Sequence, residues 1–173
     1  MPAQRLHALV VEQARQPMFY TALGVPDTLD GRFELIALHC FLVMRRLKAE
    51  PAGIALAREL VEAMFADLDA SLRELGAGDL GVGKRIKKMG QGFYGRVAAY
   101  DAALTDPAAL ELALTRNLYG TVDQPSPATV GRVAAYVVKC MRILEKQSIS
   151  DISSGFLEFP LLPDGIPAPT GGH

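Results

Sequence analysis

A cluster of basic residues is the part of this 173-residue sequence best suited to bind another molecule. Residues 80–100 contain no acid and five cations, which are Lys84, Arg85, Lys87, Lys88 and Arg96. Side chains of this kind bind phosphates, anionic lipid headgroups or an acidic protein surface. Near an anionic membrane each cation contributes about 1 kcal/mol, so four contacts give about 4 kcal/mol and a dissociation constant of about 1 mM. Such weak binding requires a second, protein-based contact.

The acids that precede this cluster offer a purely structural explanation for it. Residues 50–79 contain two arginines and seven acids, which are Glu50, Glu59, Glu62, Asp67, Asp69, Glu74 and Asp79. An acidic helix joined by a tight turn to a basic helix can pair with it along the surface, and each exposed pair contributes about 0–1 kcal/mol. The sequence leaves both interpretations open.

Three glycines, at positions 90, 92 and 95, interrupt the same basic stretch. Each costs about 1 kcal/mol relative to alanine inside a helix, so we expect a reason for them. They can allow close packing against bulky side chains of a central helix, which is the commoner reason. They can also expose the backbone beside Phe93 and Tyr94 to a partner helix. The two explanations are compatible.

Other residue types that carry chemistry lack the neighbours they would need. Two glycine patterns between residues 76 and 84 resemble nucleotide-binding loops, but the segment before them is predicted to be helical and such loops follow a strand. His7, His39 and His173 have no partner ligand three or four residues away, and we expect His39 to be a hydrogen-bonded core residue. Cys40 and Cys140 lie in apolar segments and are expected to be buried, reduced thiols. We therefore expect no enzyme, no cofactor and no metal site.

The composition favours a folded cytoplasmic protein. Half of the residues are hydrophobic, and the net charge of −1 argues against a DNA-binding protein with a globally positive field. The longest apolar run, residues 35–44, is half the roughly 20 residues that a membrane span needs, so it predicts a core helix. The first residues lack the pattern of an export signal.

The apolar periodicity predicts an all-α fold, with helices over about 3–15, 31–48, 52–75, 80–104, 107–119 and 127–146 and one more short turn after residue 147. Helix 31–48 is apolar nearly all round, which indicates a buried central helix with Asp30 as its N-cap. Helix 80–104 carries one apolar stripe, made by Ile86, Met89, Phe93, Val97, Tyr100 and Leu104. We expect one compact domain of about six or seven helices over residues 1–159. A Pro- and Gly-rich tail, 160–173, is expected to be disordered.

Three segments resemble the ubiquinol–cytochrome c chaperone family. They are GVGKRIKKM (81–89) followed by GFYGR (92–96), DTLDGRFE (27–34) followed by Leu38 and His39, and RNLY (116–119). The similarity covers roughly residues 17–147. Members of this family are assembly factors for the respiratory cytochrome bc complex. Mitochondrial members work with a partner protein, bind newly made cytochrome b and act near the ribosome.

The resemblance implies a compact bacterial member without the long N-terminal extension of the mitochondrial proteins, which makes a ribosome contact less expected here. It implies a non-enzymatic chaperone that engages cytochrome b, other bc-complex subunits or their insertion machinery, peripheral at the cytoplasmic face of the inner membrane. It supplies no catalytic residue. We expect Lys84, Arg85, Lys87, Lys88 and Arg96 to orient the protein electrostatically, and Phe93 and Tyr94 to be exposed and to contact the client. The alternative is an RNA- or small-molecule-binding helical module that uses the same basic helix, 84–96.

Overall fold

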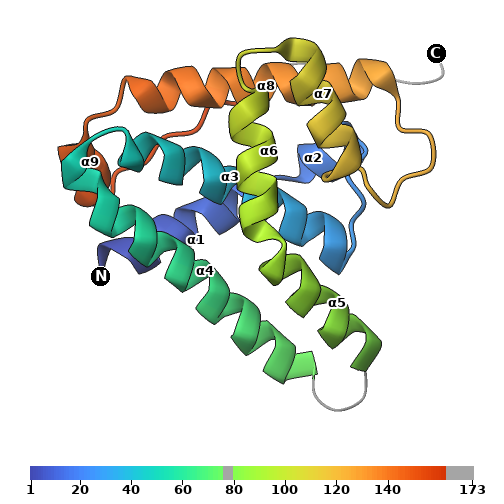
Figure 1. Cartoon of the computed structure of the whole chain (residues 1–173), viewed down its shortest axis with the longest axis horizontal. Coiled ribbons are helices and arrows are strands. Elements are labelled where there is room, and N and C mark those ends of the chain that lie inside the picture. The colour runs from blue at the N-terminus through green and yellow to red at the C-terminus, as the bar shows by residue number, and fades with distance from the viewer. Residues whose placement is uncertain (76–79, 163–173) are drawn as a thin grey trace.

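The computed structural model describes residues 1–75 and 80–162, and every regular element in these ranges is a helix, which confirms the all-α prediction (Figure 1). The longer helices are α1 (Pro2–Ala14), α3 (Leu29–Lys48), α4 (Ile54–Leu75), α5 (Leu80–Gln91), α6 (Phe93–Ala103), α7 (Pro107–Arg116) and α8 (Pro127–Glu145). The short elements are α2 (Pro17–Thr21), the 3-10 turn η1 (Pro51–Gly53) and α9 (Ile149–Ser153).

Helix α3 is the buried centre of the fold, as its apolar composition predicts. It packs against α1, α4, α5 and α8, and its side chains are buried along nearly its whole length. The prediction that Asp30 caps this helix is wrong. Thr28 is the N-cap, and its hydroxyl accepts a hydrogen bond from the Gly31 amide at 3.1 Å. Asp30 lies in the first turn, where an acid still favours the positive helix end.

The predicted single helix over 80–104 is two helices. Helix α5 ends at Gln91, α6 begins at Phe93, and Gly92 between them has φ −81° and ψ −1°. The amide of Gly92 still bonds the Lys88 carbonyl at 2.9 Å, and its own carbonyl accepts from Arg96 at 3.2 Å, so the chain bends there without losing contact between the turns. Glycine, a poor helix former, permits this change of direction, and α6 then crosses α3 (Figure 1).

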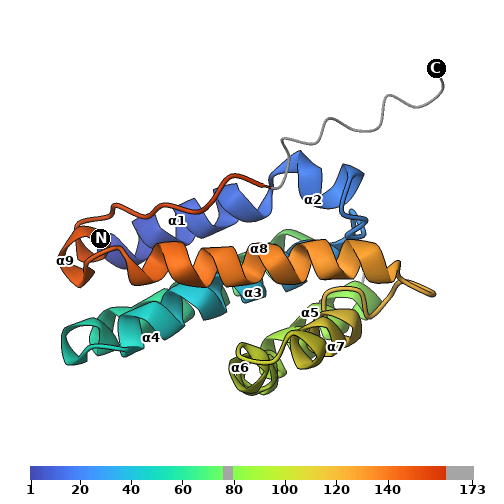
Figure 2. The same cartoon turned by 90° about the horizontal axis from the view of Figure 1, so that it is seen from above.

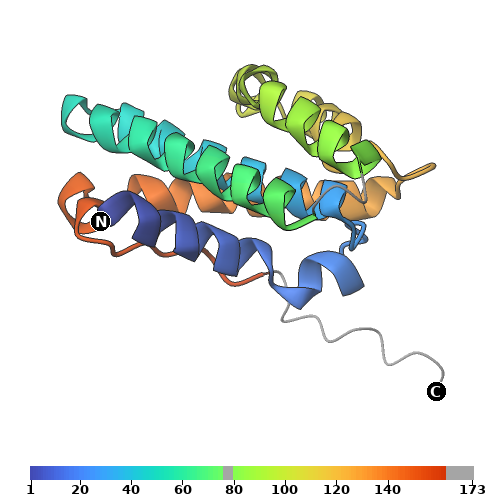
Figure 3. The ribbon, with the colours of Figure 1, turned by 90° about the horizontal axis from the view of Figure 1, so that it is seen from below.

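The helices form two groups. Helices α1, α3, α4 and α8 make the main body, and α5, α6 and α7 gather on one side of it (Figures 2 and 3). Helix α3 bridges the groups because it contacts both α4 and α5. Helices α1 and α4 pack together near their N-terminal ends and diverge toward their C-terminal ends (Figure 1).

The segment after α9 returns along α1 (Figure 2). The Arg5 side chain donates to the Gly155 carbonyl at 3.0 Å, and Gln13 donates to the Pro160 carbonyl at 3.5 Å. Pro160 is buried and Leu162 packs against the core. The first three residues of the predicted tail therefore lie on the body of the protein. The rest of that prediction concerns residues 163–173, and the two glycine patterns include residues 76–79; both ranges lie outside the described residues.

Candidate functional site

The surface of α5 presents the lysines of the basic cluster to solvent. Lys84, Lys87 and Lys88 are all exposed, and none of them forms an ion pair with another described residue. Pairing with the acids of α4 therefore does not account for these three lysines in the described part of the chain. The predicted exposure of these three is confirmed, while their role in binding stays a prediction. The side chain of Arg85 lies outside the described part.

The contact between α4 and α5 is apolar instead. A Cβ added at Gly90 would lie 2.8 Å from Leu68 Cδ2 and 3.4 Å from Phe65 Cε1, so the glycine allows the two helices to approach closely. Close packing was the expected reason, but the neighbour is α4, not the central helix. Apolar groups lie between the two helices, and Lys84, Lys87 and Lys88 of α5 are exposed to solvent.

Tyr94 and Phe93 have opposite environments. Tyr94 is 61% exposed, and its ring contacts Phe65 and Phe93 with centroids 6.4 Å and 5.4 Å away. Phe93 is 0% exposed, so the prediction that it faces a client is wrong. The physical reason is the apolar stripe of α6, since Tyr100 and Leu104 on the same stripe are also buried in the core. Tyr94 is left as the exposed aromatic residue of the pair.

Arg96 does not belong to the exposed cations, and that part of the prediction is also wrong. Its Nε donates to both oxygens of Glu34 at 2.6 and 2.9 Å, and a second guanidinium nitrogen lies 2.6 Å from Glu34 Oε1. The Glu34 side chain is 6% exposed and that of Arg96 is 19% exposed. Burial raises the pKa of Glu34, while the hydrogen bond and charge of Arg96 oppose this rise. Arg96 therefore holds α6 on α3.

His39 is the hydrogen-bonded core residue that the sequence predicts. Its Nδ1 lies 2.7 Å from the Leu35 carbonyl, which can only accept, so Nδ1 carries the proton. Its Nε2 then accepts from the Tyr136 hydroxyl at 2.8 Å, and that hydroxyl accepts from Gln13 at 2.9 Å. Complete burial lowers the pKa of His39 to about 4, so the ring is neutral. This network ties α1, α3 and α8 together.

The cysteines are free and buried, as predicted, and burial raises the pKa of both Cys40 and Cys140 to about 12. No group of three or more potential metal ligands occurs in residues 1–75 and 80–162. No helix within those ranges has the length and apolar character needed to cross a bilayer. The candidate site is the exposed basic face of α5 together with the exposed ring of Tyr94. We name Lys84, Lys87, Lys88 and Tyr94 the lysine surface.

Two of the segments that carry the family resemblance meet in space, and the third contacts a residue that lies just before segment 27–34. Glu34, at the end of segment 27–34, binds Arg96, at the end of segment 92–96. Tyr119, at the end of segment 116–119, donates its hydroxyl to the buried Leu23 carbonyl at 2.6 Å. Sequence reasoning missed both links. The signal for the first was a lone acid, Glu34, amid apolar residues in the central helix, since a buried carboxylate needs a partner.

Comparisons with known proteins identify the same family that the sequence segments resemble. The model of the family described as ubiquinol-cytochrome C chaperone matches residues 21–159. The chain is 26% identical over 152 residues to the ubiquinol-cytochrome-c reductase complex assembly factor 1 of Xenopus laevis, covering 87% of this chain and 76% of that protein. It is 26% identical over 154 residues to the mitochondrial protein CBP3 of Saccharomyces cerevisiae, covering 86% of this chain but only 45% of the yeast protein.

A solved structure gives the same result in three dimensions. The crystal structure of the Cbp3 homolog from Brucella abortus superposes with a TM-score of 0.80 and 42% sequence identity, covering 94% of this chain and 91% of that one. The family match spans most of the sequence, and the fold of the described residues is that of the solved homolog. The chain belongs to the ubiquinol–cytochrome c chaperone family.

Proposed function

We propose that this protein is a non-enzymatic assembly chaperone for the respiratory ubiquinol–cytochrome c reductase, and that it engages cytochrome b or its insertion machinery at the cytoplasmic face of the membrane. Family membership supports the chaperone role. The observation that carries the membrane contact is the exposure of Lys84, Lys87 and Lys88 on one helix, without an ion pair to any described residue. Tyr94, near the start of the next helix, offers an exposed amphipathic ring to a client or to the membrane interface.

The lysine surface provides orientation and little affinity. Three lysines near an anionic membrane contribute about 3 kcal/mol, which corresponds to a dissociation constant of about 10 mM. Arg96 adds nothing to this value, because it is committed to Glu34. A second contact with protein must therefore supply most of the binding free energy. In this proposal the lysines bring the protein to the membrane, and the client holds it there.

The experiment is a complementation test in a bacterial strain that lacks the chaperone. The variant Lys84→Glu/Lys87→Glu/Lys88→Glu reverses the charge, and the matched control Lys84→Arg/Lys87→Arg/Lys88→Arg keeps it. The readouts are assembled bc complex on native gels and circular dichroism of the purified proteins. We expect both variants to fold and only the arginine variant to restore the complex. Normal assembly with the folded glutamate variant would contradict the proposal, and salt-sensitive RNA binding by the wild type that is lost in this variant would favour the RNA-binding alternative.

A further inference from the structure

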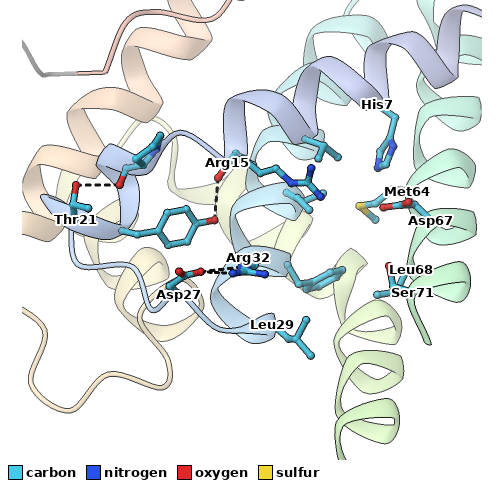
Figure 4. Close-up of a pocket in the computed structure, with 16 residues that line it drawn as sticks. His7, Arg15, Thr21, Asp27, Leu29, Arg32, Met64, Asp67, Leu68 and Ser71 are labelled. Carbon is cyan, nitrogen blue, oxygen red and sulfur yellow. Dashed lines mark hydrogen bonds and ion pairs between the residues drawn. The ribbon is translucent and has the colours of Figure 1, made fainter. Parts of the chain in front are cut away.

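A groove opens where α1 and α4 diverge, away from the lysine surface. Its volume is about 590 Å³, and it is lined by Phe33 and Ile36 of α3 together with residues of α1, α2 and α4 (Figure 4). Val11 of α1 and Met64 of α4 add apolar side chains to this lining. The groove therefore has an apolar lining contributed by the central helix and by the helices on either side of it.

Two charged side chains of opposite sign, Arg15 and Asp67, lie on opposite sides of the groove. Arg15 lies on one side near the Asp27–Arg32 ion pair, and Asp67 lies on the other side near His7 (Figure 4). Within the described ranges, neither Arg15 nor Asp67 is in an ion pair. Each is thus available to an opposite charge on an occupant.

His7 is the second sign that the groove is built for a ligand. It is 9% exposed and lines the groove, and its Nε2 is buried without a hydrogen-bond partner among the described residues. A buried nitrogen without a partner costs about 1–3 kcal/mol. An occupant that reaches this nitrogen with a polar side chain would remove that cost.

These features favour a helix over the other possible occupants. The walls are helices whose backbone groups are already bonded within each helix, so an extended peptide would find no backbone partners there, whereas a helix satisfies its own. A lipid carries its charge at one end and would place hydrocarbon against Asp67 or Arg15. We propose that the groove binds an amphipathic helix of a partner protein, with an acidic residue facing Arg15 and a basic residue facing Asp67.

The spacing of the two charges on the occupant is taken from α1, because Asp67 lies near His7 (Figure 4). His7 and Arg15 are eight residues apart on α1, which corresponds to about 12 Å along the helix axis. An acid and a base seven residues apart on one face of a helix span about 10 Å and match this length. The inference deepens the proposed function, because such a helix in the client or in a companion subunit supplies the second contact that the lysine surface needs.

The test uses the full chain and four synthetic, end-capped 15-residue helical peptides with a fluorescent label. Three share one leucine face and carry Glu/Lys, Glu/Glu or Lys/Lys seven residues apart, and the fourth is a scramble of the Glu/Lys peptide without an apolar face. We expect the wild type to bind the Glu/Lys peptide best. An exposed pair contributes up to about 1 kcal/mol, so Asp67→Lys should transfer the preference to the Glu/Glu peptide by about fivefold, and Arg15→Glu should transfer it to the Lys/Lys peptide.

Steric variants locate the binding. Ser71→Trp fills the groove, and Ala70→Trp, on an exposed position of α4 that does not line it, is the matched control. We expect Ser71→Trp alone to weaken binding at least about tenfold, a loss of about 1.4 kcal/mol. Equal affinity for the Glu/Lys and scrambled peptides, or unchanged preferences in Asp67→Lys, would overturn the proposal. If none of the four peptides binds and oleate binds saturably, the groove is a lipid site and the proposal is overturned. Because these variants leave the lysines intact, the groove can fail while the lysine surface still supports assembly of the complex.

Discussion

The guanidinium of Arg96 on α6 holds the buried carboxylate of Glu34 on α3, with donor–acceptor distances of 2.6 and 2.9 Å. This pair crosses 62 positions of sequence and fixes the second helix group on the central helix. It also sets the limit of the basic surface, because a cation that neutralises a buried acid cannot contact a membrane. At this pair, the family segments 27–34 and 92–96 have a structural role, because they join α3 to α6.

Removal of Arg96 should destabilise the protein strongly. Arg96→Ala leaves Glu34 buried without a partner, and we expect the free energy of unfolding to fall by about 3 kcal/mol. The double variant Glu34→Leu/Arg96→Leu should recover most of this loss, because no buried charge remains. Urea unfolding at pH 7 measures both values, with the exposed Arg142→Ala as control.

The pH dependence of the free energy of unfolding of Arg96→Ala tests whether the buried charge of Glu34 causes the loss. Burial raises the pKa of Glu34, so protonation relieves the cost of the buried charge, and removal of Arg96 removes the groups that oppose that rise. A group with a raised pKa stabilises the folded state below its unfolded pKa and loses this contribution as the pH rises. The deficit of Arg96→Ala should therefore shrink as the pH falls toward 4. A deficit below about 1 kcal/mol at pH 7, the value of an exposed pair, would contradict this role.

His39 should make the stability of the protein fall with acid. Burial lowers its pKa from 6.5 to about 4, so protons bind the unfolded chain first. Stability is complete above pH 6.5 and is lost as the pH falls through this range, by about 2 kcal/mol between pH 6.5 and 5. His7, whose pKa burial also lowers, acts in the same direction. The measurement is therefore His7→Gln against His7→Gln/His39→Gln, unfolded in urea at several pH values. Equal slopes in the two proteins would contradict the assignment.

Gly31 and Gly95 form a matched pair that tests close packing. A Cβ at Gly31 would lie 2.0 Å from the Pro26 carbonyl oxygen, a backbone atom that cannot move aside alone. We expect Gly31→Ala to lower the free energy of unfolding by at least about 2 kcal/mol, because the first turn of α3 must shift. At Gly95 nothing lies within 4 Å, so Gly95→Ala should stabilise α6 by up to about 1 kcal/mol. Equal effects of the two changes in thermal unfolding would show that the packing at Gly31 does not matter.

Much of the fold follows from composition and periodicity. Helix α3 is recognisable because it is apolar nearly all round, and the structure buries it as expected. The break at Gly92 was harder to foresee, since glycine permits a bend without requiring one. Asp30 was predicted as the N-cap, but Thr28 is also of a type that favours this position, and it is the residue that caps the helix. In the structure, the Gly31 amide donates to the Thr28 hydroxyl, and Gly31 lies against the carbonyl of Pro26.

The site was less predictable than the fold for a physical reason. Lys84 and Arg96 look alike in sequence, and only a partner 62 residues away decides which is exposed. Phe93 was different, because its place in the apolar stripe with Tyr100 already indicated burial and conflicted with a client contact. The groove between α1 and α4 depends on the angle between helices, which periodicity does not encode.

The most direct test of the central claim is a flotation assay of the full chain with vesicles. At about 10 mM accessible lipid and low salt, we expect part of the wild type to float with phosphatidylglycerol vesicles and none with phosphatidylcholine vesicles, in line with the weak affinity of three lysines. The bound fraction should fall as salt rises, because screening weakens exposed charges. Lys84→Glu/Lys87→Glu/Lys88→Glu should reduce the partition coefficient at least about 100-fold, which corresponds to the loss of about 3 kcal/mol, and the triple arginine variant should keep it. Equal flotation of the wild type and the triple glutamate variant on anionic vesicles would contradict a membrane-facing lysine surface.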